Sequence, residues 1–230
     1  DTNSLALFRI SIAILILFDL ILNSSNLTAH YTDNGVLPRS ELMQNYFRPW
    51  YLSIHFISGD ESFQVFLFFI AGIFAILMLL GFYTKLATFM SWYFLTSLHI
   101  RNPYVLQNGD VLFHLLLFWS LFLPLGASYS IDSLSSSKKK LPKRILSFGT
   151  AAIVLQAAFL YVFSAILKSS KDWWPDGTAV YYALSAEQFT SEFGLFLLKF
   201  PAIIKFLTYA VYFFELIGPF LLFTPFLFFP

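Results

Sequence analysis

Residues 5–22 read LALFRISIAILILFDLIL, an almost unbroken run of aliphatic and aromatic side chains. An apolar helix of about 18 residues is long enough for the ~30 Å hydrocarbon core of a bilayer. Arg9 and Asp19 lie near opposite ends of the run, about 15 Å of helix rise apart, so they do not pair with each other. The run is too long, and too tolerant of an acid, for a signal-peptide core. We therefore expect a retained membrane span.

The composition of the whole chain agrees with this start. Its 230 residues are 58% hydrophobic and 20% aromatic but only 12% charged, about half the charged fraction of soluble domains. The excess apolar surface is expected to face lipid, which makes this a polytopic protein of the bilayer. The net charge of +1 says nothing about nucleic acid, and no basic aromatic patch suggests it, so we expect no nucleic-acid partner. The chain has no cysteine, and its four histidines lie too far apart in sequence to form a local metal motif, so we predict no metal site; the alternative is a spatial cluster.

Further apolar runs predict an all-α fold, a transmembrane bundle of about six spans with additional interfacial helices. A long polar connection, residues 23–62, follows the first span, and residues 178–200 have the amphipathic pattern of interfacial helices. The predicted spans are residues 5–22, 63–82, 86–99, 111–125, 145–167 and a last span that begins near residue 203.

The orientation follows from one short basic loop. Five positive charges between Lys138 and Arg144 predict a cytoplasmic loop, and counting six spans outward places the N-terminus on the same side. Three polar stretches then gather on the opposite, extracytoplasmic side. We call them the polar mouth: residues 23–62, 100–110 and 168–200.

Lys168 is the first candidate catalytic residue. It ends an apolar segment and precedes a turn that contains Trp173 and Trp174, at the boundary that indole rings prefer. Desolvation favours the neutral form of an amine, so Lys168 could act as a base. The alternative is that Lys168 only extends its ammonium to the membrane surface, as terminal lysines commonly do.

Asp110 and His114 are four positions apart and share one helical face at the membrane edge. A carboxylate beside an imidazole can fix its tautomer, so the two residues could handle protons in catalysis. The alternative is a helix start capped by Asp110, with His114 satisfied inside the bundle. Glu215 lies well inside the last span and should face the protein interior with a polar partner. Arg101, on the side of the polar mouth, is a candidate substrate-binding residue together with Glu215.

Several motifs resemble the HTTM family, bacterial membrane proteins related to the vitamin K-dependent gamma-carboxylases. The resemblance covers nearly all of residues 1–230, which we expect to form one integral membrane domain. The motifs are LFR at 7–9, YTDNGVLPR at 31–39, HIRNP at 99–103 with NGD at 108–110, SYSID at 128–132, WWPDGTAVYYAL at 173–184 and FELIGPFLLFTP at 214–225.

The resemblance implies a multi-span protein of the bacterial inner membrane whose cofactor is reduced vitamin K or a related quinone. In the carboxylase relatives a lysine base deprotonates the hydroquinone on the extracytoplasmic side. That lysine is the second of an adjacent pair before a Trp-x-x-Gly motif, which here matches Trp174 to Gly177. The match places Lys168 at the first lysine and Ser169 at the second, and it makes Trp174 and Gly177 candidate substrate-binding residues. The relatives' functional histidine corresponds to Gly109, beside Asp110.

Two functions therefore stay open. The first is a carboxylase- or epoxidase-like membrane enzyme, a lyase in the carboxylase case, that acts on a quinone-like or other apolar small molecule with Lys168 as base. The second is a non-catalytic membrane anchor, or a partner-binding domain, for a soluble domain beyond Pro230. The hydrophobic last residues and the absence of an initial Met are typical of a piece of a longer protein.

Overall fold

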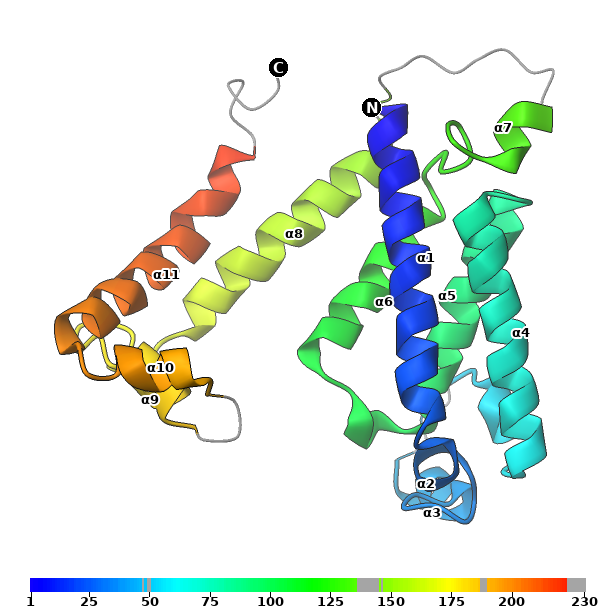
Figure 1. The fold of residues 1–230 in the computed structure, drawn as a ribbon, viewed down its shortest axis with the longest axis horizontal. Coiled ribbons are helices and arrows are strands. Elements are labelled where there is room, and N and C mark those ends of the chain that lie inside the picture. The colour runs from blue at the N-terminus through cyan, green and yellow to red at the C-terminus, as the bar shows by residue number, and fades with distance from the viewer. Residues whose placement is uncertain (47, 49–50, 136–144, 146, 187–189, 223–230) are drawn as a thin grey trace. The chain divides into compact units, whose positions relative to one another are not determined.

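A computed structural model describes residues 1–46, 48, 51–135, 145, 147–186 and 190–222, and within these ranges it contains helices and turns but no strand. The predicted all-α class is therefore confirmed for the described residues (Figure 1). The basic cluster of residues 138–144 lies outside them. The helices are α1 Thr2–Ser24, α2 Leu27–Tyr31, α3 Arg39–Asn45, η1 Ile54–Phe56, α4 Glu61–Leu80, α5 Thr84–Arg101, η2 Pro103–Val105, α6 Asn108–Ser120, α7 Ile131–Ser135, α8 Phe148–Leu167, α9 Ala179–Ser185, α10 Glu192–Leu197 and α11 Pro201–Leu221.

The prediction of six spans is wrong. Within the described residues, four helices are long and apolar enough to cross a membrane: α1, α4, α8 and α11. The runs predicted as the third and fourth spans do form helices, α5 and α6. Helix α6 has only 13 residues, a rise of about 20 Å, which is short of the hydrocarbon core. Helix α5 contains Lys85, His99 and Arg101 along with several hydroxyl residues, which lower its hydropathy.

The chain forms two compact units, residues 1–151 and 152–230. In the first unit, α1 packs on α4, α4 on α5, and α5 on α6. Consecutive helices run in opposite directions, so the connections gather at two ends (Figure 1). One end holds the segment between α1 and α4 and the turn between α5 and α6, and the other holds the α4–α5 turn and the segment after α6. The single domain that we predicted over residues 1–230 stays a prediction.

Two fully buried arginines connect the helices of the first unit to its loops. Arg9 of α1 donates from its guanidinium to the carbonyl oxygens of Leu125, at 2.8 Å, and Tyr129, at 2.5 Å. Arg101, the last residue of α5, donates to the carbonyl oxygens of Leu37 and Thr32 at 2.8 and 3.0 Å. A guanidinium presents several donors in a planar fork, which suits two carbonyls at once.

A carboxylate from a later segment caps helix α5. Asp132 accepts hydrogen bonds from the backbone N–H groups of Tyr83 and Thr84 at 2.9 and 2.8 Å, and from the Thr84 hydroxyl at 2.7 Å. The first N–H groups of a helix have no partner within the helix, so an acidic side chain there stabilises its start. Asp132 thereby joins the SYSID segment to the α4–α5 turn.

The segment between α1 and α4 folds onto the first unit through buried polar contacts. His55 is 2% exposed, and its Nδ1 lies 2.5 Å from Oε1 of Gln64. Burial lowers the pKa of His55 to about 4, so this ring stays neutral near neutral pH. The same segment also contacts α5, because the hydroxyl of Ser53 donates to the carbonyl oxygen of Ser97 at 2.7 Å.

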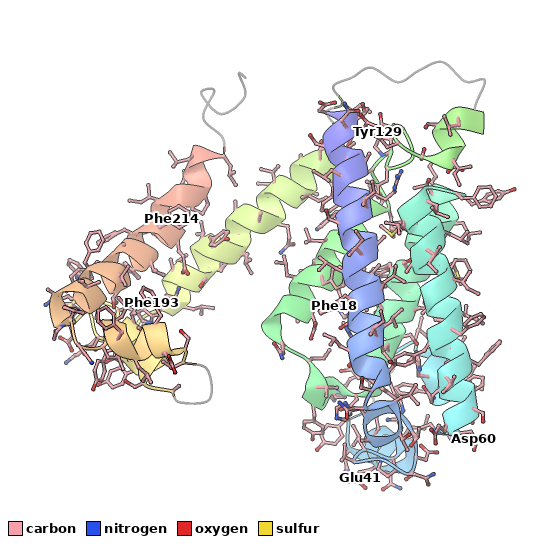
Figure 2. All side chains as sticks on the ribbon, viewed as in Figure 1. Phe18, Glu41, Asp60, Tyr129, Phe193 and Phe214 are labelled. Atoms are coloured by element: carbon pink, nitrogen blue, oxygen red, sulfur yellow. The ribbon has the colours of Figure 1, made fainter. Side chains whose placement is uncertain are left out.

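In the second unit, α9 packs against α11 and α10 packs against α9. The two short helices lie within the region predicted to hold interfacial helices, residues 178–200. Large apolar side chains remain exposed on both units. Phe18 of α1 is 58% exposed and Phe214 of α11 is 64% exposed (Figure 2). Exposed apolar surface on helices of this length is typical of contact with lipid.

Candidate functional site

The second unit contains an ion pair between Lys168 and Glu215, two of the candidate site residues. Lys168 follows directly on the last residue of α8, and its Nζ donates to Oε2 of Glu215 on α11. The side chains are 17% and 15% exposed, so the pair is largely removed from solvent. The Nζ of Lys168 also lies 4.5 Å from the ring centre of Trp173, a cation–π distance. The predicted polar partner for Glu215 is confirmed, and it is Lys168.

An aromatic surface lies on the same stretch of chain. Trp174 is 55% exposed, and its ring packs against Tyr209 and Phe213 of α11, with ring centres 5.2 and 5.7 Å away. The Tyr209 hydroxyl donates to the carbonyl oxygen of Pro175 at 2.5 Å, which holds the Trp174 turn on α11. One face of the cluster is therefore packed, while much of the Trp174 ring stays accessible.

Gly177 closes this turn with a left-handed backbone, at a φ of +73°. A Cβ at this position would lie 2.8 Å from Cγ of Lys205 and 3.0 Å from Cζ of Tyr209. Glycine thus lets the turn approach α11 closely and adopt a positive φ. Asp172 supports the turn from the other side, because its Oδ1 accepts from the Thr178 hydroxyl at 3.1 Å.

Asp110 and His114 are both tied into the first unit. Asp110 accepts from the backbone N–H of Gln107 at 2.7 Å and forms a capping box at the start of α6. The Nε2 of His114 lies 2.5 Å from Nδ1 of His99 on α5. These contacts agree with the reading of a capped helix start and a satisfied histidine. Their roles in catalysis stay predictions.

Arg101 is 0% exposed, and its two terminal nitrogens are bonded to backbone carbonyls. These contacts give it a structural task, and its role in substrate binding stays a prediction. Lys168 belongs to one compact unit, and Asp110 and His114 belong to the other, so joint action of the three in catalysis stays a prediction.

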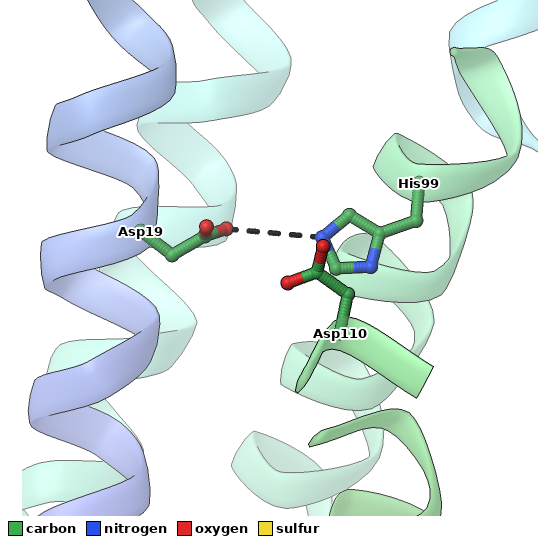
Figure 3. A group of neighbouring side chains, drawn as sticks. All are labelled: Asp19, His99 and Asp110. Carbon is green, nitrogen blue, oxygen red and sulfur yellow. Dashed lines mark ion pairs between the residues drawn. The ribbon is translucent and has the colours of Figure 1, made fainter. Parts of the chain in front are cut away.

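Three side chains from different helices converge in the first unit: Asp19 of α1, His99 of α5 and Asp110 of α6 (Figure 3). One ligand atom from each lies within 4.8 Å of the other two. From the sequence we named Asp19 and Asp110 separately, predicted no metal site and did not bring the three residues together. A signal was available: Asp19 near the end of the first apolar run and His99 near the end of the third fall at the same side in the predicted orientation.

Comparison with known protein families identifies the domain to which nearly the whole chain is similar. The model of the HTTM domain matches residues 1–227. No curated protein and no solved structure matches the chain.

Proposed function

We propose that this chain, which belongs to the HTTM family, is an integral membrane protein that binds a quinone-like apolar molecule beside Trp174 and removes a proton from it with Lys168. The observation that carries the proposal is the Lys168–Glu215 pair, two ionisable side chains in contact at the end of an apolar helix. Ionisable groups inside membrane segments are costly and are commonly functional.

The pair provides chemistry that neither residue has alone. In a largely desolvated site the proton can move from the Lys168 ammonium to the Glu215 carboxylate, which leaves a neutral amine and a neutral acid without any change in net charge. The neutral amine can then accept a proton from a substrate hydroxyl. The resulting ammonium stays beside the oxyanion that it has formed and stabilises it.

The aromatic surface suits a flat substrate. Trp174 offers an exposed ring whose other contacts are already made by Tyr209 and Phe213, so a planar apolar molecule could stack on it without further rearrangement. The Lys168 ammonium lies against the ring of Trp173, the residue that precedes Trp174 in the chain, which supports a base close to this surface. Reduced vitamin K, which the carboxylase relatives use, has the flat ring and the hydroxyl that this arrangement needs.

The location proposed for this site is the extracytoplasmic side of a bacterial inner membrane. Helices α5 and α6 form an antiparallel pair, so the chain returns to the side on which α4 ended whether or not the pair crosses the bilayer. The sidedness deduced from the basic loop is therefore kept with four long spans. The chain has no cysteine, so single cysteines at Ser136 and Ser170 can be labelled on intact cells. Labelling of Ser136→Cys but not of Ser170→Cys from outside would reverse the orientation.

Turnover and binding together test the proposed reaction. Purified protein is supplied with vitamin K hydroquinone and molecular oxygen, the oxidant that epoxide formation requires, and consumption of the hydroquinone and formation of the epoxide are measured. Lys168→Met should lower turnover by about 10²–10⁴-fold, the range for loss of a general base, while the hydroquinone still binds. Glu215→Gln should also lower turnover. Trp174→Ala should instead weaken binding, as measured by equilibrium dialysis with the hydroquinone.

Lys171→Met is the matched control, because Lys171 is an exposed lysine in the same turn. It should keep turnover within about twofold of wild type, a difference small beside the loss expected for a general base. Binding without turnover in the wild-type protein would favour the anchor or partner-binding function. Absence of both would remove the proposal.

A further inference from the structure

The cluster of Asp19, His99 and Asp110 brings together three side chains that are far apart in sequence (Figure 3). They come from α1, α5 and the start of α6. In the first unit α1 packs on α4, α4 on α5, and α5 on α6. We infer that this cluster binds one divalent transition-metal ion, with one ligand atom from each residue. This inference does not rest on the proposed function, since none of the three residues belongs to the Lys168 site.

The two carboxylates are already oriented by contacts to one oxygen each. Asn23 donates from Nδ2 to Oδ1 of Asp19 at 3.0 Å, and the backbone N–H of Gln107 donates to Oδ2 of Asp110 at 2.7 Å. The other oxygen of Asp19, Oδ2, is itself buried, although the side chain as a whole is 24% exposed, and it has no hydrogen-bond partner among the described residues. Buried acceptors are normally satisfied, so an atom of this kind needs an explanation. A bound cation would provide one.

The imidazole of His99 is held in the orientation of a metal ligand. The side chain is 4% exposed, and Nδ1 lies 2.5 Å from Nε2 of His114. With the proton on Nδ1, His99 donates to His114 and its Nε2 carries a free lone pair. That Nε2 faces Oδ2 of Asp19 at 3.9 Å, which is too long for a hydrogen bond but suits two ligands of one ion. His114 would then orient the ligand from behind, as the outer partner of a metal-bound histidine does.

The charge of the cluster also indicates a cation. Among the described residues, the ion pairs of Asp19 and Asp110 include no lysine or arginine. The adjacent Arg101 is bonded to the carbonyl oxygens of Thr32 and Leu37. Two carboxylates beside a neutral imidazole carry a charge of −2, and a divalent ion would neutralise it. Mixed nitrogen and oxygen ligands favour Mn²⁺, Fe²⁺ or Zn²⁺ over Ca²⁺ and Mg²⁺, which prefer oxygen alone.

The test is a Mn²⁺ titration of the metal-stripped full chain, with free Mn²⁺ measured by electron paramagnetic resonance and Zn²⁺ used as the competitor. We expect one Mn²⁺ per chain, displaced by Zn²⁺. Asp19→Asn, Asp110→Asn and His99→Gln should each weaken binding by at least about tenfold, the loss typical of even outer-sphere partners. Asp60→Asn is the matched control, because this exposed acid stands at the N-cap position of α4 in the same unit and lies outside the cluster. It should bind Mn²⁺ as the wild type does.

Two further measurements guard against variants that fail to fold. In the wild-type chain, Mn²⁺ should broaden the ring resonances of His99 and His114. Mn²⁺ should also raise the melting temperature of the wild type and leave that of Asp19→Asn unchanged, although the metal-free variant, relieved of one negative charge, should be at least as stable as the metal-free wild type. Binding of less than one ion per chain, or unchanged affinity in all three variants, would overturn the inference.

Discussion

Each compact unit contains a largely buried cationic side chain, and the two side chains have different kinds of hydrogen-bond partner. In the first unit, Arg9 donates to the backbone carbonyls of Leu125 and Tyr129. In the second unit, Lys168 contacts a side-chain carboxylate, that of Glu215. A carbonyl oxygen can accept a hydrogen bond but cannot take the proton, whereas a carboxylate can do both. The comparison teaches that a buried charge indicates chemistry only when its partner can exchange a proton with it.

The largest effect expected from this comparison is at Arg9. Arg9→Met should lower the free energy of unfolding by about 4 kcal/mol, because it removes hydrogen bonds from a charged donor and leaves buried carbonyls without partners. Unfolding in detergent, followed by circular dichroism, measures the loss. Leu15→Met, at a 52% exposed position of the same helix, should change little. An Arg9→Met protein as stable as wild type would mean that carbonyl-bound arginines do not hold the first unit together.

The second effect concerns His55, a buried group whose partner is an amide. The pKa of His55 is lowered from 6.5 to about 4, so the unfolded chain binds the proton more readily than the folded one. The stabilising contribution is fully present above about pH 6.5 and is lost as the pH falls towards 4, with an upper limit of about 3 kcal/mol. Unfolding measured from pH 7.5 to pH 4 should show this slope.

His55→Asn should flatten the slope between pH 6.5 and pH 4, because asparagine does not titrate there. The difference between the two proteins at pH 7.5 reports the packing change alone and serves as the baseline. An unchanged slope in the variant would assign the pH dependence to other groups.

The third prediction turns on the Lys168–Glu215 pair. Lys168→Met or Glu215→Leu alone should cost about 2 kcal/mol, because each leaves the other ionisable group desolvated without its partner. The double variant should recover most of that loss, since two apolar side chains replace the pair. A double-mutant cycle on the free energies of unfolding measures the coupling. Additive losses would indicate that the two side chains are not coupled in the folded protein.

The smallest effect is expected at Gly177. Gly177→Ala should destabilise the second unit by about 1–2 kcal/mol, because the positive φ and the close approach of Lys205 and Tyr209 both oppose a Cβ. Gly72→Ala in α4 is the control, because a Cβ there meets no atom within 4 Å. It should be neutral or slightly stabilising, as alanine is a better helix former. Melting temperatures of the two variants give the comparison.

The helices with long apolar runs could be predicted from the sequence. The runs at 5–22 and 63–82 fall on α1 and α4 because lipid requires a fixed length of apolar helix, and that requirement is local. Helices α5 and α6 could be located but not correctly counted as spans. Helix α6 is too short and α5 too polar for a span of the expected kind. Helix α5 packs on both α4 and α6, and a single sequence does not reveal such contacts.

The candidate sites divide in the same way. The turn at Lys168–Gly177 could be recognised because its residues are contiguous and its composition differs from the apolar segments on either side. The partnership of Lys168 with Glu215, 47 positions away, depends on how the chain folds back. The cluster of Asp19, His99 and Asp110 is harder still, because it joins three helices and no short motif connects it.

The cap that Asp132 provides for helix α5 also bears on the timing of synthesis. The amides of Tyr83 and Thr84 find their acceptor 49 and 48 positions later in the chain. While the ribosome is still translating α6, Asp132 has not yet been made. The α4–α5 turn therefore leaves the exit tunnel without the two hydrogen bonds that cap α5. Its completion must wait until the SYSID segment emerges. The order in which this chain is made therefore sets the order in which one end of the first unit can close.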